Sequence, residues 1–177
     1  PGAVSNGENI EARSEMAYAA YLSGIALANA NLGVVHGLSS AVGAARAVPH
    51  GVVCGTLLPG ATGLIADKLL AEVRSGEASS AGARTALYKY SRAAAEITGR
   101  EFPGSGASWV DDAEELIVEM NRLFRSWIAD FGIPSLEDYG FTGDELRECA
   151  ASAGIKKTPV ELTAEEVSEI ALSSARA

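Results

Sequence analysis

The chain has 177 residues, 47% of them hydrophobic, and its 14 Lys and Arg against 23 Asp and Glu give a net charge of −9. This length is enough for one domain with a buried core. The acidic balance argues against nucleic-acid binding, because the chain has no basic stripe to neutralise phosphates. Cys54 and Cys149 lie far apart and outside any Cys-x-x-Cys unit, which indicates reduced thiols and a cytoplasmic location. The sequence opens without a charged n-region and apolar h-region, so secretion is not expected.

The first half of the chain predicts a loop followed by helices. Residues 1–7 are loop-like, and Asn9 or Glu8 is expected to start a helix that runs to about Asn31. The next helices are expected over 34–47 and 49–58, since Pro suits the first turn of a helix. Pro also breaks a helix that it interrupts, so the pair at 59–60 is expected to end the third helix before it resumes over 61–73.

The second half carries local start and stop signals for further helices. A capping Ser, Thr or Asp before a run with helical spacing predicts a start, and a Gly after it predicts an end. The signals are Ser79 or Ser80 with Gly99, Ser108 with Gly132, Thr142 for a helix to about Ala153, and Thr163 for the last helix. Because no segment alternates with period two for long enough to be a strand, the chain is predicted to be all-α.

The only two histidines, His36 and His50, lie in a stretch that is nearly free of charge. Between Met16 and Ala66 the sole charged residue is Arg46. A neutral imidazole is the commonest metal ligand in proteins. Along one unbroken helix the two residues would lie roughly 21 Å apart, but Pro49 prevents that helix and favours a helix–turn–helix in which the rings converge. The alternative is a helical interaction module in which both histidines are structural.

The uncharged stretch also raises the possibility of a membrane hairpin, because it is long enough for two spans. Its apolar residues are mostly Ala and Gly, however, and Asn29, Asn31 and His36 would be costly at depth. A central helix surrounded by other helices explains the same neutrality. We therefore expect no membrane span.

Several motifs in the chain resemble the iron-containing (group III) alcohol dehydrogenases. The most specific is the two-histidine spacing, in which His36 lies in a small-residue helix and His50 lies in a Pro-His-Gly unit. The resemblance covers nearly the whole chain and rests on Asn31–Leu38, Gly43, Pro49-His50-Gly51, Leu57-Leu58-Pro59, Glu11-Ala12-Arg13 and Gly132–Gly140.

The resemblance implies a two-domain enzyme of dehydroquinate synthase-like architecture. Residues 1–177 match only its C-terminal helical, metal-binding domain, so the α/β nucleotide-binding domain is expected to lie outside this chain, which would be part of a longer polypeptide. Family members hold Fe²⁺, and sometimes Zn²⁺, with one Asp and three His. His36 and His50 match the last two of these ligands.

The activity implied by the resemblance is NAD- or NADP-linked hydride transfer to or from an alcohol or aldehyde. The metal would act as a Lewis acid on the substrate oxygen, while the nicotinamide carries the redox chemistry. The cofactor would be bound mainly by the domain that is not in this chain. The implied partners are a small alcohol or aldehyde, the chain's own N-terminal domain and further copies in a homo-oligomer. The 177 residues alone are expected to be inactive.

Two positions depart from the family pattern. Many members have a second histidine four residues after the first, where this chain has Ser40, which either lines the cleft or packs. Near the C-terminus, members often have an Asn-Pro pair, where this chain has Lys157-Thr158-Pro159. A hydroxyl cannot act as a base near neutral pH, so the departure at Ser40 puts a proton relay through that position in doubt.

Other residues allow both a functional and a structural interpretation. Cys54, one helical turn beyond His50, is a conceivable soft ligand, although a small core residue is favoured. The acids at Asp111, Asp112, Glu114 and Glu115 suggest a cation site, but first-turn acids more often stabilise the helix dipole. Trp109 and Trp127 are expected to make core or interdomain contacts.

Overall fold

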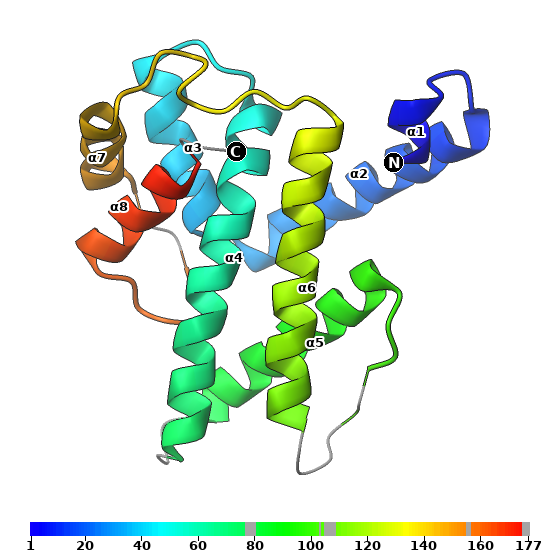
Figure 1. The fold of residues 1–177 in the computed structure, drawn as a ribbon, viewed down its shortest axis with the longest axis vertical. Coiled ribbons are helices and arrows are strands. Elements are labelled where there is room, and N and C mark those ends of the chain that lie inside the picture. Colours follow the sequence, from blue (N-terminus) through cyan, green and yellow to red (C-terminus); the bar gives the residue numbers. More distant parts are fainter. Residues whose placement is uncertain (77–80, 103, 105–108, 155–156, 175–177) are drawn as a thin grey trace.

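The computed structural model describes residues 1–76, 81–102, 104, 109–154 and 157–174. Within these residues the chain forms helices and no strand, which confirms the all-α prediction (Figure 1). The helices are α1 Gly2–Ser5, α2 Ile10–Ala30, α3 Val34–Ala45, α4 His50–Ser75, α5 Ala81–Thr98, α6 Trp109–Asp130, α7 Gly143–Ser152 and α8 Ala164–Ser173.

Helix α4 forms the centre of the fold. It contacts α3, α5, α6 and α8, while α7 packs on α3 and α8. In Figure 1 the long helices α4 and α6 run side by side and α5 crosses behind them. The largest fully buried side chains are Leu38, Leu57, Leu69, Leu87, Ile117, Leu136, Leu146 and Ile170. They come from six helices and the α6–α7 connection, so one continuous core holds this part of the fold together.

Local signals set most of the helix ends as predicted. The Asn9 side chain accepts from the Ala12 amide at the start of α2. Thr142 and Thr163 each form a capping box with the glutamate three residues later, which satisfies two otherwise free amide groups. Gly99 and Gly132, at the ends of α5 and α6, have positive φ angles of 69° and 60°. Ser79, Ser80 and Ser108 lie outside the described residues.

The predicted break at Pro59-Gly60 is wrong, because α4 continues through both residues. Pro59 is buried inside the helix. Gly60 faces α8, where a Cβ atom would collide with the Ser173 hydroxyl and lie 3.0 Å from the Ser173 Cβ. The glycine thus allows close packing of α4 on α8. This tertiary packing outweighs the backbone hydrogen bond that the proline removes.

The prediction of a loop over residues 1–7 is also wrong in part, since Gly2–Ser5 form the short helix α1. The larger surprise is α2, in which none of the 21 residues is buried. Among the helices it makes substantial contact only with α1, and the pair projects from the rest of the fold in Figure 1. The part of the uncharged stretch that forms α2 is therefore exposed, and only the later part contributes to the core.

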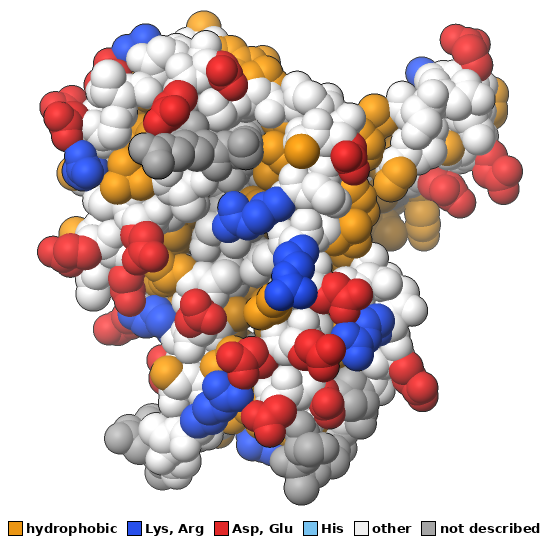
Figure 2. All heavy atoms as spheres, in the orientation of Figure 1, with side chains coloured by type: hydrophobic (Ala, Val, Ile, Leu, Met, Phe, Trp, Pro, Cys, Tyr) orange, Lys and Arg blue, Asp and Glu red, His pale blue; other side chains and the backbone are white. Residues whose placement is uncertain are grey.

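The exposed surface of α2 is strongly apolar. Tyr18, Tyr21 and Met16 are 64%, 66% and 59% exposed, and Figure 2 shows hydrophobic side chains on the projecting arm. The other large exposed apolar residues of this helix are Ile10, Leu22, Ile25 and Leu27. So many large exposed apolar side chains on one helix are typical of an interface.

One described helix, α4, is long and apolar enough to cross a membrane, and half of its most apolar window is buried inside the domain. The pair α2 and α3 passes the same test only if both are taken as one span, but they are bent by 101°. Core helices of globular proteins have the same length and composition as α4, and its contacts on all sides match that role.

Candidate metal centre

The two histidines come together at the junction of α3 and α4. His36 lies in the first turn of α3, and His50 is the first residue of α4, directly after the N-cap Pro49. The segment between the helices reverses the chain direction. As the spacing predicts, the rings converge, with centroids 5.3 Å apart and planes inclined by 26°.

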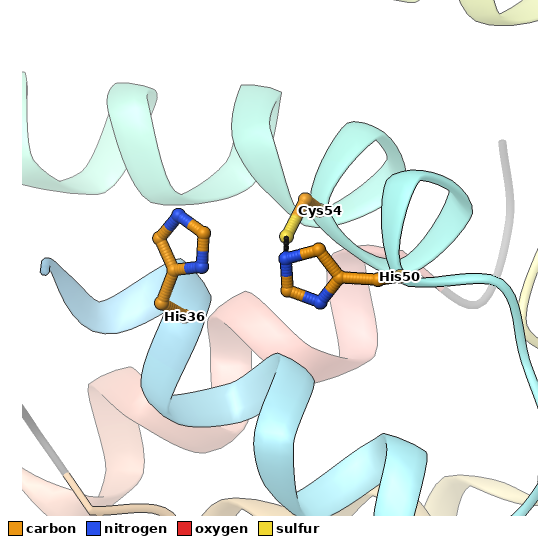
Figure 3. A group of neighbouring side chains, drawn as sticks. All are labelled: His36, His50 and Cys54. Atoms are coloured by element: carbon orange, nitrogen blue, oxygen red, sulfur yellow. Dashed lines mark hydrogen bonds between the residues drawn. The ribbon is translucent and has the colours of Figure 1, made fainter. Parts of the chain in front are cut away.

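Cys54 lies on α4 one turn beyond His50, and its Sγ is 3.4 Å from His50 Nε2 (Figure 3). The donor atoms of Cys54, His36 and His50 all lie within 4.8 Å of one another. Cys54 is half-buried, so the favoured interpretation as a core residue does not describe its position. The signal for this arrangement was its i, i+4 spacing from His50.

Burial raises the pKa of the Cys54 thiol, while a hydrogen bond with Ser39 acts in the opposite direction. His36 is half-buried and His50 is exposed. Although the histidines lie in a nearly charge-free stretch of the sequence, within the described residues the ring of His50 is open to solvent. The donor groups therefore form one wall of a site and not an enclosed cavity.

The helices that carry these side chains are anchored by the core beneath them. Val34 and Leu38 flank His36 on α3, and Val53 and Leu57 follow His50 on α4, with all four at most 2% exposed. Donor groups on packed helices are held more precisely than donor groups on loops. The buried neighbours of each histidine thus hold α3 and α4, and with them the donor side chains, in place.

Two imidazoles and one thiol form a donor set that suits a divalent transition metal. Nitrogen and sulfur ligands are the ones that Zn²⁺ prefers, and imidazole also suits iron. Among the described residues, this is the only group of three or more His, Cys, Asp or Glu that are close enough to hold an ion. The donor set therefore fits a metal of the kind that the motif implies.

Ser40, at the position that departs from the family pattern, is exposed one turn after His36. Its hydroxyl donates to the backbone carbonyl of His36 at 2.9 Å. Ser40 is thus on the site's helix, but its hydroxyl is engaged with the backbone. Thr158 makes a similar local bond, to the carbonyl of Val160.

Three of the acids at the start of α6 form ion pairs with arginines. Asp111 and Glu114 pair with Arg74, at 3.0 and 2.6 Å, and Glu115 pairs with Arg100 at 3.1 Å. These acids link α6 to α4 and to the end of α5. Of the two tryptophans, Trp109 is buried in the core beside Tyr88, and Trp127 is half-buried beside Phe124.

Comparison with known proteins places this arrangement in a family. The model described as "Fe-containing alcohol dehydrogenase family, C-terminal" matches residues 1–175. The chain therefore belongs to the iron-containing alcohol dehydrogenases. It resembles an NAD-dependent methanol dehydrogenase of Bacillus methanolicus, with 33% identity over 169 residues, and a 1,3-propanediol dehydrogenase of Klebsiella pneumoniae, with 35% identity over 142 residues. These matches cover 96% and 78% of this chain.

Solved structures of the family share the fold. A 1,3-propanediol oxidoreductase matches with a TM-score of 0.72 and 28% identity, and an alcohol dehydrogenase from Oenococcus oeni with 0.67 and 32%. Both alignments cover 98% of this chain and 40% of the other. Against the two dehydrogenases named above, the chain spans 35% and 30% of their lengths. It corresponds to about a third of such an iron-type enzyme.

Proposed function

We propose that residues 1–177 form the C-terminal metal-binding domain of a metal-dependent, NAD(P)-linked alcohol dehydrogenase or aldehyde reductase. The observation that carries this proposal is the convergence of His36 and His50 in a chain of the iron-containing alcohol dehydrogenase family. An α/β domain that binds the nucleotide would complete the enzyme. The chain by itself would then be inactive.

His36 and His50 would hold a divalent ion, Fe²⁺ or Zn²⁺, at the wall formed by the start of α3 and the start of α4. When bound, such an ion polarises the oxygen of an alcohol or aldehyde substrate. The packed residues of α3 and α4 orient the two imidazoles. Ser40, exposed beside them, would line the same cleft and contribute a hydroxyl but no base.

The apolar surface of α2 is where we expect this domain to meet other parts of the enzyme. Seven large apolar side chains are exposed on this one helix, and the first of the related enzymes is about three times as long as this chain. Contact with its own N-terminal domain would bury this helix, and homo-oligomer formation would cover further surface. The acidic charge and the two free thiols are consistent with a cytoplasmic enzyme.

A non-enzymatic interaction module is the competing function, because the stacked imidazoles and the exposed α2 would serve a binding surface equally well. The two proposals differ in metal content. In the protein that carries both domains, His36→Ala and His50→Ala should deplete the metal, measured by elemental analysis, and abolish NAD(P)-linked turnover.

Circular dichroism of each variant should remain helical, because His50 is exposed and His36 half-buried, so neither ring is needed by the core. Isolated residues 1–177 should show no turnover with simple alcohols above background. A His50→Ala enzyme that kept both its metal and its activity would rule out the ligand assignment, and structural histidines would then be the better interpretation.

A further inference from the structure

Arg46 is the sole charged residue of the nearly charge-free stretch, and it lies in the connection that brings His50 back to His36. It is the C-cap residue of α3, where its amide donates to the carbonyl of Val42 at 3.1 Å. Its own carbonyl accepts from the amide of Val48 at 3.0 Å, shortly before His50 begins α4. The backbone of Arg46 is thus part of the turn that sets where α4 starts.

The side chain of Arg46 leaves this turn and reaches α7, which lies beside α3 (Figure 1). Its Nη2 donates to Oε1 of Glu145, and its Nη1 donates to the carbonyl of Tyr139 at 3.5 Å. The guanidinium carbon lies 5.0 Å from the centroid of the Phe141 ring. A Cβ atom at Gly140 would lie 2.9 Å from Nη1, so the glycine leaves the space that the guanidinium occupies. One short segment, 139–145, therefore receives the whole head group.

The groups that receive Arg46 are held in place by other contacts. Phe141 is buried, and its amide donates at 3.1 Å to the carbonyl of Leu136, which is also buried. Glu145 uses its two oxygens separately, because Oε2 accepts from the Thr142 amide in the capping box at 2.8 Å while Oε1 accepts from Arg46. The Thr142 amide, followed by the Arg46 guanidinium, holds the pKa of Glu145 below its ordinary value. The segment is therefore a fixed point to which the α3–α4 connection is tied.

We propose that Arg46 is a positioning residue for the metal centre, which sets the place of His50 relative to His36 by tying the α3–α4 connection to α7. The inference rests on the proposed function, since it concerns the placement of the same two ligands. His36 lies within α3 between the buried Val34 and Leu38, whereas His50 is exposed and is the first residue of its helix. Site groups must be held to within about 0.5 Å, so a small shift of this turn is enough to weaken the site.

The competing explanation is that Val48, which packs against the core, fixes the connection by itself, and that Arg46 only joins α3 to α7. The two explanations differ in what is lost with the ion pair. The side chains of Arg46 and Glu145 are 39% and 40% exposed, and ion pairs this open contribute little to stability. A purely structural Arg46 would leave the metal affinity of the folded protein unchanged, whereas a positioning residue would lower it.

The test uses the protein that carries both domains. Zn²⁺ affinity is measured by competition with a chromophoric chelator, and the d–d absorption of the Co²⁺-loaded protein reports the geometry of the ligands. The variants are Arg46→Met, which removes the guanidinium, and Glu145→Gln, which removes the charge but keeps an acceptor for the capping box. The matched control is Arg147→Met, which breaks the exposed pair with Asp144 on the same helix. Circular dichroism and urea unfolding establish that each variant is folded.

We expect Arg46→Met and Glu145→Gln each to weaken Zn²⁺ binding by about three- to tenfold and to shift the Co²⁺ spectrum, because a group bonded directly to a ligand typically contributes about 10- to 100-fold. The double variant should lose little more than either single variant, since both remove the same contact. Arg46→Lys should keep part of the affinity, because an ammonium group still pairs with Glu145 but lacks the planar fork that also reaches the Tyr139 carbonyl. Arg147→Met should match the wild type.

Unchanged Zn²⁺ affinity in either Arg46→Met or Glu145→Gln, in a protein that loses its metal on His50→Ala, would overturn the positioning role and leave the proposed function standing. Losses that add in the double variant would also overturn it, since the two side chains would then act separately. Metal that stays bound in His50→Ala would overturn the proposed function itself.

Discussion

Among the described glycines, Gly60 leaves the least room for an added side chain. Its Cα faces the side chain of Ser173, and an added methyl group would collide with the Ser173 hydroxyl and approach its Cβ to 3.0 Å. The hydroxyl is not free to turn away without cost, since it donates to the carbonyl of Ile170 at 2.7 Å. The glycine therefore sets how closely α4 and α8 approach.

We predict that Gly60→Ala lowers the free energy of unfolding by about 1–3 kcal/mol, the usual cost of overpacking. The measurement is urea unfolding followed by circular dichroism. Gly55→Ala is the matched control on the same helix, because nothing lies within 4 Å of its Cβ position, and it should stabilise by up to about 1 kcal/mol. Adding Ser173→Ala to Gly60→Ala should restore part of the loss. Equal stability of the Gly60 and Gly55 variants would contradict this account.

Residue-scale reasoning from the sequence found the histidines but not the role of their neighbour. His36 and His50 could be predicted to converge because Pro49 fixes the local chain direction, which is a property of adjacent residues. The half-buried position of Cys54 depends on how α3 lies against α4, which no spacing along the chain specifies. For this reason the sequence favours a core position for the thiol, whereas in the structure it faces the imidazole of His50.

At the scale of helices, the boundaries that depend on neighbouring residues agree with the prediction, and the boundary that does not agree lies where α4 packs against a residue distant in sequence. Thr142 and Thr163 start α7 and α8 as predicted, because a capping box involves residues only three apart. The pair Pro59-Gly60 has the local signature of a helix break, yet α4 runs through it. At Gly60 the continuous helix packs against Ser173, near the other end of the chain, and a contact between residues so far apart in sequence cannot be read from a local pattern.

Helix α8 is tied to α4 by one ion pair with a clear acid dependence. Lys68 Nζ donates to both carboxylate oxygens of Glu166 at 2.7 Å. This ammonium group, followed by the backbone amide of Thr163, holds the pKa of Glu166 below its ordinary value. A carboxylate whose pKa is lower in the folded state stabilises the fold above its unfolded pKa, and the contribution is lost as the pH falls through the folded value.

We therefore predict that Lys68→Met reduces the acid sensitivity of the chain. Wild-type stability should fall as the pH drops from the ordinary glutamate pKa of about 4.3 through the lower pKa of Glu166 in the folded state, and the variant should lose less stability over the same range. Urea unfolding at a series of pH values measures both slopes. Arg147→Met is the control, because its partner Asp144 is 90% exposed and surface pairs contribute little. Identical slopes in wild type and Lys68→Met would be evidence against this role.

For the whole molecule, α2 determines how the domain behaves when it is alone. From the sequence, the neutrality of the stretch that contains α2 is explained by a central helix surrounded by other helices. Burial, however, depends on what lies opposite the helix, and among the described residues only α1 makes substantial contact with it. The remaining core, centred on α4, is complete without it. The fold therefore combines a self-contained bundle with an arm that needs a partner.

We predict that residues 1–177 self-associate through α2 when no other domain covers it. Burying a large apolar side chain contributes about 1.5–3 kcal/mol, so Tyr21→Glu with Ile25→Glu should raise the dissociation constant at least tenfold, since about 1.4 kcal/mol corresponds to tenfold. Sedimentation velocity across the micromolar range would measure this shift toward the monomer. Ser14→Glu with Ser23→Glu adds the same charge to the same exposed helix and should leave the association largely intact. A wild-type chain that sediments as a monomer at every concentration would show that the arm is stable in water, and its apolar surface would then need another explanation.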